Sequence, residues 1–201
     1  MRYYIADLHF YHINLLTKMD CRDFSSVEEM NDCIIEQWNK KIKKNDEVVI
    51  LGDLSYGNGE QTNAILRQLN GRLFLIKGNH DDRFLKDKQF DSSRFIWIKD
   101  YAELNDNGRK VVLCHYPICC YNGQYRTDDK GNGKTYMLYG HVHNSRDQQL
   151  IEQFIHITRN TRINPNDDHD LRTIPCQMIN CFCMFSNYQP LTLDEWIEQQ
   201  I

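Results

Sequence analysis

Five short apolar segments of this chain are each followed, within three residues, by an aspartate, an asparagine or a histidine. The segments are RYYIA, EVVIL, RLFLI, KVVLC and TYMLY, and the polar residues behind them are Asp7, Asp53, Asn79, His115 and His141. Short apolar runs bounded by glycine and polar residues are typical of buried β-strands. Because the carboxyl ends of strands form the ligand-binding edge of an open α/β sheet, we expect these five side chains to converge.

Helical patterns separate the early strand segments. Residues 27–41 follow a Ser26-x-x-Glu29 capping sequence and carry apolar residues at helical spacing, and residues 60–69 have a similar apolar face. This alternation of strands and helices predicts parallel pairing in an α/β layer arrangement. The later strand segments follow one another with little helix between them, which predicts an antiparallel or mixed part.

The remaining segments complete one expected domain over residues 1–201, a length that suits a single core. We expect a short helix over 150–157, a late strand over 178–185, a final helix over 193–200, and polar loops over 121–134 and 158–173. Neither loop resembles a domain boundary, so both are interpreted as insertions.

The sequence carries no secretory or membrane-spanning pattern. Its N-terminus lacks a basic region followed by an apolar stretch, and no window approaches the roughly 18 consecutive apolar residues that a membrane helix needs. The eight cysteines form no C-x-x-C pair, so we expect reduced, mostly buried thiols rather than disulfides or a zinc ribbon. We therefore expect a cytoplasmic protein that binds no membrane.

The polar residues at the strand ends have the chemistry of metal ligands. Asp7 and His9 are two residues apart, as are His141 and His143, and on extended segments this spacing puts both side chains on one face. Imidazole, carboxylate and amide ligands without thiolate favour a divalent Mn, Fe, Zn, Co or Ni ion. The candidate ligands are Asp7, His9, Asp53, Asn79, His115, His141 and His143. They are too many for one ion and suit two ions that share a carboxylate.

The order of these motifs resembles the calcineurin-like metallophosphoesterase superfamily. The chain reads D-x-H, G-D, G-N-H-D, a single H and G-H-x-H in that order, and the resemblance is closest to the small bacterial and phage-type branch. Residues 7–14, 24–30 and 187–195 also look like that branch. Residues 180–184 depart from it because they are bulkier and more apolar, and residues 144–177 are hard to align with it.

The resemblance implies a fold, a ligand set and an activity. The implied fold is a four-layer α/β/β/α sandwich of two mixed sheets flanked by helices. Asp7, His9 and His143 would hold one ion, Asn79, His115 and His141 the other, and Asp53 would bridge both. The implied enzyme is a phosphoric ester hydrolase acting on phosphomonoesters or phosphodiesters, with manganese among its candidate metals. A hydroxide that bridges the ions would attack phosphorus in line, His80 would protonate the leaving group, and Asp81 would orient His80.

Two other functions stay open at this point. A nuclease or RNA-processing phosphodiesterase would use the same site, but 28 acidic residues against 24 basic ones, for a formal net charge of -4, disfavour nucleic acid as the partner. A small phosphoester is the favoured substrate. A binding scaffold without activity would be marked by lost ligands, and none is lost. The sequence indicates no oligomeric state.

Several nearby residues have two interpretations each. Arg22 either reaches a phosphate or lies on the surface, and the surface interpretation is favoured. His12 either touches the substrate or caps its segment. Tyr116 either lines the pocket or packs in the core. The loop over 121–134 either overhangs the crevice or takes no part.

Overall fold

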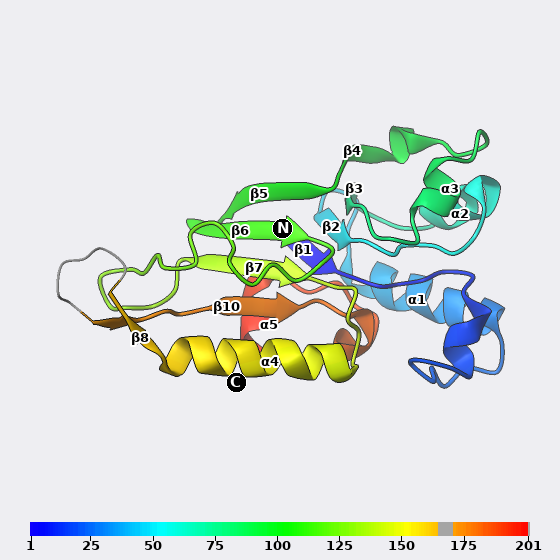
Figure 1. Ribbon diagram of the computed structural model, residues 1–201. Coiled ribbons are helices and arrows are strands. Elements are labelled where there is room, and N and C mark those ends of the chain that lie inside the picture. Colours follow the sequence, from blue (N-terminus) through cyan, green and yellow to red (C-terminus); the bar gives the residue numbers. More distant parts are fainter. Residues whose placement is uncertain (165–170, 201) are drawn as a thin grey trace.

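Two four-stranded sheets form the centre of the computed structural model, which describes residues 1–164 and 171–200 (Figure 1). The first sheet, ordered β1-β2-β3-β4, consists of Arg2–Ile5, Glu47–Leu51, Arg72–Ile76 and Phe95–Lys99, all parallel. The second, ordered β10-β7-β6-β5, consists of Gln177–Asn180, Thr135–Tyr139, Arg109–Cys114 and Tyr101–Asp106. Here β5 is antiparallel to β6, and the other neighbours are parallel. The expected two-sheet α/β fold is confirmed, with the difference that only the second sheet is mixed.

Helices lie outside the two sheets. The α-helices of the described residues are α1 (Val27–Lys41), α2 (Gly59–Leu66), α3 (Asp82–Leu85), α4 (Arg146–Asn160) and α5 (Leu193–Glu198). Single 3₁₀ turns are η1 (Ile13–Leu16), η2 (Ser92–Arg94) and η3 (Cys183–Ser186), and β8 (Arg162–Ile163) pairs with β9 (Arg172–Thr173) beyond α4. In the part of the chain that the structure describes, no helix has the length and hydropathy required to cross a bilayer.

The α1 and α2 helices begin at polar caps. The Ser26 hydroxyl accepts a hydrogen bond from the Glu29 N–H and starts α1, although the Glu29 carboxylate turns to Ser25 instead of closing the expected box. A complete capping box between Asn58 and Gln61 starts α2. These local bonds satisfy amide groups that the first helical turn leaves free.

Successive side chains of each strand point to opposite faces of its sheet, so both sheets are apolar on both faces. Four layers of helices and sheets therefore enclose three apolar cores between them. In β2, Val48 and Ile50 face α1 and α2, whereas Val49 and Leu51 face the second sheet. In β7 the side chain of Met137 faces α4. All of these side chains are fully buried. The α/β/β/α layering is thereby explained by a period of two in each strand.

The apolar segment over 178–185 is not one strand as the sequence predicts. β10 ends at Asn180, and the chain then leaves the sheet to lie beside the first one: the Ala6 N–H donates to the Cys181 carbonyl, and the Cys183 N–H donates to the Ala6 carbonyl. The 3₁₀ turn η3 follows. Residues 178–183 are all buried at this junction of the two sheets, which gives an apolar run that resembles a strand in the sequence, whereas Phe185 is 41% exposed.

The segment before it also differs from expectation. The α4 helix has fifteen residues and starts at a Ser145 cap, so it is much longer than the predicted 150–157. Its Ile151, Phe154 and Ile155 side chains pack on the second sheet. The loop predicted over 158–173 is replaced at its ends by α4 and the β8–β9 pair, while positions 165–170 lie outside the described residues.

The cysteines are unpaired, as expected, but they are not uniformly buried. Cys176, Cys181 and Cys183 are buried, whereas Cys21 and Cys120 are exposed. Thiol packing is therefore concentrated in the segment around β10.

Candidate metal centre

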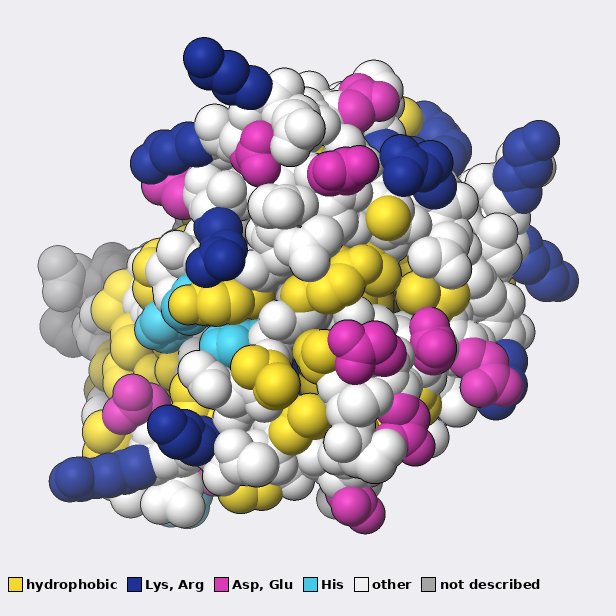
Figure 2. All heavy atoms as spheres, turned by 90° about the vertical axis from the view of Figure 1, so that its right-hand side faces the viewer, with side chains coloured by type: hydrophobic (Ala, Val, Ile, Leu, Met, Phe, Trp, Pro, Cys, Tyr) yellow, Lys and Arg dark blue, Asp and Glu magenta, His cyan; other side chains and the backbone are white. Residues whose placement is uncertain are grey.

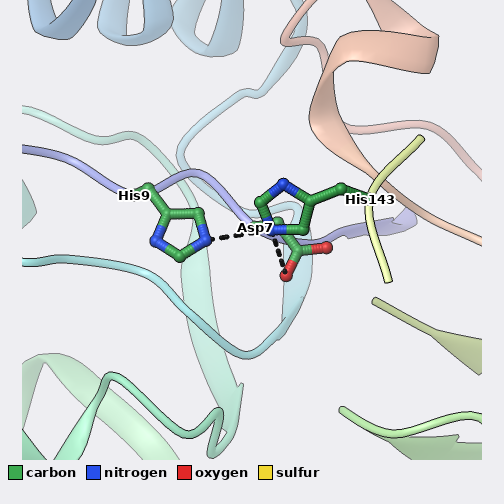
Figure 3. Close-up of side chains that lie close together, drawn as sticks. All are labelled: Asp7, His9 and His143. Atoms are coloured by element: carbon green, nitrogen blue, oxygen red, sulfur yellow. Dashed lines mark hydrogen bonds and ion pairs between the residues drawn. The ribbon is translucent and has the colours of Figure 1, made fainter. Parts of the chain in front are cut away.

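The carboxyl ends of strands from both sheets meet in one place, and the candidate ligands gather there. One group contains Asp7, His9 and His143, and a second contains Asp53, His115 and His141. In each group the potential ligand atoms lie within 4.8 Å of one another. Figure 3 shows the first group, with both imidazole rings directed toward the Asp7 carboxylate. Nitrogen and oxygen donors at this separation fit divalent metal ions.

The site opens on the face of the molecule viewed in Figure 2. Histidine side chains reach the surface there beside a band of hydrophobic side chains, and a single Lys or Arg side chain adjoins them. The donors beneath this surface are buried: Asp7, His9, Asp53, His115 and His143 are each at most 5% exposed. Buried titratable groups in such numbers are costly unless something binds them.

The backbone of the ligand segments is left-handed, not extended as the spacing of two suggests. The φ angles are positive at Asp7 (57°), His9 (53°), Asp53 (51°), His141 (70°) and His143 (48°). Between the first two, Leu8 turns into the core. Such φ values are uncommon outside glycine and concentrate at functional sites. Asp7 and His9 lie in one ligand group, whereas His141 and His143 lie in different groups, so the extended geometry expected of these segments is wrong.

Glycines stand next to the ligands because the backbone and side chains approach too closely for a Cβ atom. A Cβ at Gly78 would lie 2.2 Å from Asp53 Oδ1, and one at Gly140 would lie 2.6 Å from Asp7 Oδ2. At Gly52, where φ is +87°, a Cβ would lie 2.4 Å from His115 Nδ1. The G-D, G-N and G-H pairs in the sequence therefore have a steric origin.

Asp53 lies between the two groups. Its Oδ2 is 3.6 Å from His9 Nε2 in the first group and 3.5 Å from His115 Nε2 in the second. Its Oδ1 accepts a hydrogen bond of 2.8 Å from the His80 N–H. Burial acts to raise the pKa of Asp53, but His115 and His9 hold that pKa well below its usual range.

Asn79 joins the second group although its side chain is exposed. Its Oδ1 lies 3.1 Å from His115 Nε2 and 2.9 Å from His141 Nδ1. His115 Nδ1 lies 2.8 Å from the Leu51 carbonyl, which can only accept, so this nitrogen carries the proton and Nε2 faces the site. All seven candidate ligands are thus brought together.

Charge within the centre shifts its titrations in opposite directions. Burial raises the pKa of Asp7 to about 6, although His143 and His115 act against this. Burial acts to lower the pKa of His115, but the Asp53 and Asp7 carboxylates outweigh it and bring that pKa to about 9. Burial lowers the pKa of His9 well below its usual value. Without bound cations, the carboxylates and imidazoles compensate one another.

His80 lies beside the two groups and belongs to neither. Its side chain is 38% exposed, and its Nε2 is 4.0 Å from Asp53 Oδ2. Its ring centroid is 5.4 Å from that of His9 and 5.7 Å from that of Tyr56. A ring at the edge of the centre, open to solvent, is placed to meet a group that arrives from outside.

Asp81 does not make the contact that the sequence predicts. Its carboxylate is fully buried and accepts hydrogen bonds from the N–H groups of Gly78, Asp53 and Leu54, at 2.7, 3.0 and 2.8 Å. None of its hydrogen bonds in the described structure goes to the His80 ring. Asp81 therefore fixes two ligand-bearing loops to each other and acts on the backbone rather than on His80.

The structure also decides between the two interpretations of each flanking residue. Arg22 is neither on the surface nor free for a phosphate: it is 1% exposed and donates to the Asp7 and Leu8 carbonyls. The His12 ring makes no cap and stacks on Tyr56 at 4.2 Å. Tyr116 is 47% exposed, with its ring 4.5 Å from that of His141, so it lines the site.

Sequence reasoning missed Asp20, whose Oδ1 lies 2.6 Å from His143 Nδ1. It lies in an irregular loop, and no strand end or motif marks it. Tyr121, in the loop that either overhangs the crevice or takes no part, is buried, with its hydroxyl donating to the Gln177 carbonyl. That end of the 121–134 loop is anchored to the second sheet.

Comparisons with known proteins agree with this geometry. A family model described as calcineurin-like phosphoesterase matches residues 3–174. An uncharacterized protein of Methanocaldococcus jannaschii is 29% identical over 194 residues, covering 96% of this chain and 86% of that protein. The gene 66 protein of Mycobacterium phage D29 is 30% identical over 190 residues, covering 83% and 85%. The crystal structure of a protein of unknown function from Aquifex aeolicus has the same fold, with a TM-score of 0.66 and 23% identity over 100% of this chain and 99% of that chain.

Proposed function

The chain belongs to the calcineurin-like phosphoesterase family, and on this premise we propose that it hydrolyses small phosphoesters with two divalent ions bound at the candidate metal centre. The observation that carries the proposal is the place of Asp53, whose Oδ2 lies within 3.6 Å of an imidazole nitrogen from each ligand group. A carboxylate between two donor sets is suited to bridge two ions.

The proposed ligand sets follow the two groups. Asp7, His9 and His143 would hold one ion, Asn79, His115 and His141 the other, and Asp53 both. Bound ions would supply an activated water near neutral pH and neutralise charge on the phosphate. Manganese is one ion that these donors suit, beside iron, zinc, cobalt and nickel.

The chain's own residues would supply the proton transfer. His80 stands outside the ligand groups, is partly exposed, and is tied to Asp53 through its N–H. We assign it the role of general acid, which gives a proton to the departing ester oxygen. Asp81 supports this from the backbone side, because it joins the loop that carries His80 to the loop that carries Asp53.

A small phosphoester is the proposed substrate, in preference to nucleic acid. Hydrophobic side chains border the exposed histidines in Figure 2, and the Lys and Arg side chains on this face stand singly rather than clustered around the histidines. Nucleic-acid surfaces instead carry clustered basic side chains that neutralise phosphates. Near the end of α1, Lys40 pairs with Glu36 and Lys41 with Glu195, so these two basic side chains are matched by acidic ones.

A substrate panel tests the proposal. Protein stripped with a chelator and reloaded with Mn²⁺ should hydrolyse aryl phosphomonoesters or bis-aryl diesters, and the stripped protein should not. A supercoiled plasmid, assayed in parallel for nicking, should stay intact. Nicking without hydrolysis of small esters would favour a nuclease, and two bound ions with no hydrolysis of any ester would favour a binding scaffold.

A further inference from the structure

The loop between η1 and α1 places an ion pair behind the metal centre. Asp20 Oδ2 accepts a hydrogen bond of 3.0 Å from Arg22 Nε and forms an ion pair with Arg22 Nη2, also at 3.0 Å. The side chains are 4% and 0% exposed. A buried guanidinium is costly unless its N–H groups are satisfied, so this pair needs further partners.

Those partners are in the first ligand segment. Arg22 Nη2 donates to the Asp7 carbonyl and Nη1 to the Leu8 carbonyl, both at 2.8 Å. The guanidinium also lies over the rings of Phe182 and Tyr188, at 5.9 and 5.7 Å. Arg22 thus holds the Asp7 and Leu8 peptide groups by hydrogen bonds, at the segment where Asp7 and His9 have left-handed backbone conformations.

The other oxygen of the carboxylate reaches the second chain segment of the same ligand group. Asp20 Oδ1 lies 2.6 Å from His143 Nδ1. Because Arg22 keeps Asp20 ionised and accepting, Nδ1 of His143 carries the proton and Nε2 presents its lone pair. That Nε2 lies 3.1 Å from His9 Nε2 and 3.7 Å from Asp7 Oδ1, where the ligand atoms of this group converge.

We propose that Asp20 and Arg22 are positioning residues that set the ring orientation and tautomer of His143 and the backbone of Asp7–Leu8. This rests on the proposed metal role of the first ligand group. Carboxylates that hold a ligating histidine through its second nitrogen raise its basicity and fix its direction, and their loss typically weakens metal binding about 10- to 100-fold. This one buried ion pair contacts both Asp7 and His143, two candidate ligands that are 136 positions apart in the chain.

The alternative is that the pair only anchors its loop. An anchor would lower the melting temperature when broken but would leave the His143 tautomer and the affinity for metal unchanged. The two roles therefore differ in measurements that do not depend on activity.

The first test leaves Asp20 and Arg22 unchanged and uses His143→Ala only to assign the signal. In zinc-loaded wild-type protein, ¹⁵N-detected imidazole spectra should show one histidine that is protonated at Nδ1, has a strongly hydrogen-bonded proton, and disappears in His143→Ala. Finding His143 protonated at Nε2 and bound through Nδ1 would overturn the proposal, whatever the variants do.

The second test is Asp20→Asn, with Asp23→Asn as a matched control that removes the same charge from an exposed position of the same loop. Calorimetry should show two Mn²⁺ bound by the wild type, and in Asp20→Asn one of the two should bind about 10- to 100-fold more weakly. The visible spectrum of the Co²⁺-loaded variant should also change. The control should match the wild type in both.

The outcomes separate this inference from the proposed function. A wild type that binds no Mn²⁺ contradicts the proposed function itself. A wild type that binds two ions, with an Asp20→Asn variant of equal affinity and unchanged Co²⁺ spectrum, contradicts only the positioning role. If Asp20→Asn does not fold, the tautomer measurement on the wild type still decides.

Discussion

The two ends of the same pair of sheets handle charge in opposite ways. At the carboxyl ends of the strands, Asp7 and Asp53 are nearly inaccessible, and their neighbours are imidazoles and backbone N–H groups. Five of the seven candidate ligands there have positive φ. Each such conformation costs on the order of 1 kcal/mol or more, so this end stores strain as well as charge.

At the amino ends, charges are matched by fixed opposite charges and remain in contact with water. A cavity of about 500 Å³ lies there, lined among others by Arg2, Glu47, Arg109 and Asp194. Arg2 pairs with Glu47, and Arg109 pairs with Asp194, with side chains that are 22–62% exposed. Partly exposed pairs of this kind contribute little to stability, about 0–1 kcal/mol.

The difference shows which features mark the site. The cavity is at the end where partly exposed ion pairs lie at the surface, and the proposed function is at the end where buried carboxylates and imidazoles face one another. Burial of metal-type donors with a strained backbone is therefore the better guide than cavity size, and variants at the two ends should behave differently.

The largest difference is expected for Asp53→Asn against Glu47→Gln, each of which removes one carboxylate from β2 or the residues just after it. Asp53→Asn should lose bound metal and reduce kcat/KM on the order of 10³-fold or more, because both ion sites depend on it. Glu47→Gln should keep both its bound metal and its kcat/KM. Metal content by mass spectrometry and hydrolysis of an aryl phosphate measure this, and an Asp53→Asn protein that keeps two ions would refute the bridging role.

A smaller loss, confined to the chemical step, is expected for His80→Ala. Metal content should stay at the wild-type level, while kcat falls about 10²- to 10⁴-fold, because a general acid is lost and the ligands are kept. The loss should be greatest for esters with poor leaving groups, which need the proton most. Loss of metal in this variant would instead make His80 a ligand.

Gly78→Ala tests the steric reason for the glycines. Its Cβ would lie 2.2 Å from Asp53 Oδ1, so the bridging carboxylate must move, and metal affinity should fall about 10- to 100-fold, as when a ligand is misoriented. Gly108→Ala is the control: it has open space around the Cβ but a φ of +80°. It should cost about 1 kcal/mol of stability without changing the metal affinity.

The site residues differ in how far the sequence alone predicts them. Asp53 and Asn79 were predictable because each follows an apolar run and a glycine, and parallel strands bring such ends together. Asp20 was not, because it comes from an irregular loop 123 positions from His143 and nothing local signals the contact. Asp81 was assigned to the correct loop with the wrong partner, since sequence does not distinguish a backbone contact from a ring contact.

The fold, like the site, has parts that the sequence predicts and parts that it does not. The apolar runs of β2 and β7 predicted buried strands, whereas the four layers were implied only by the family resemblance, because strands buried on both faces carry no period. The segment over 178–185 was predicted as one strand because the burial of residues 178–183 at the junction of two sheets gives an apolar run without a period. Long-range packing, rather than local preference, ended β10 at Asn180.

The pH dependence of metal binding is a further contrast between the two ends. In metal-free protein the pKa of His115 is about 9 and that of Asp7 about 6, so His115 holds a proton at pH 7 that an incoming ion must displace. Affinity should rise as pH increases, by up to about 10-fold per unit below pH 9, and then level off. Calorimetry in buffers of different ionisation enthalpy should detect about one proton released at pH 7, and an affinity independent of pH between 6 and 8 would contradict this.

The smallest effect is expected for Asp194→Asn at the amino end. Its carboxylate is 62% exposed and pairs with Arg109 near the first turn of α5, where a negative charge is only mildly favourable. The free energy of unfolding should fall by at most about 1 kcal/mol, and less in 1 M salt because exposed pairs are screened. Urea unfolding at two salt concentrations measures it. A loss of several kcal/mol, or any change in metal content, would mean that the charges at this end are coupled to the fold more strongly than their exposure indicates, and the contrast between the two ends would not hold.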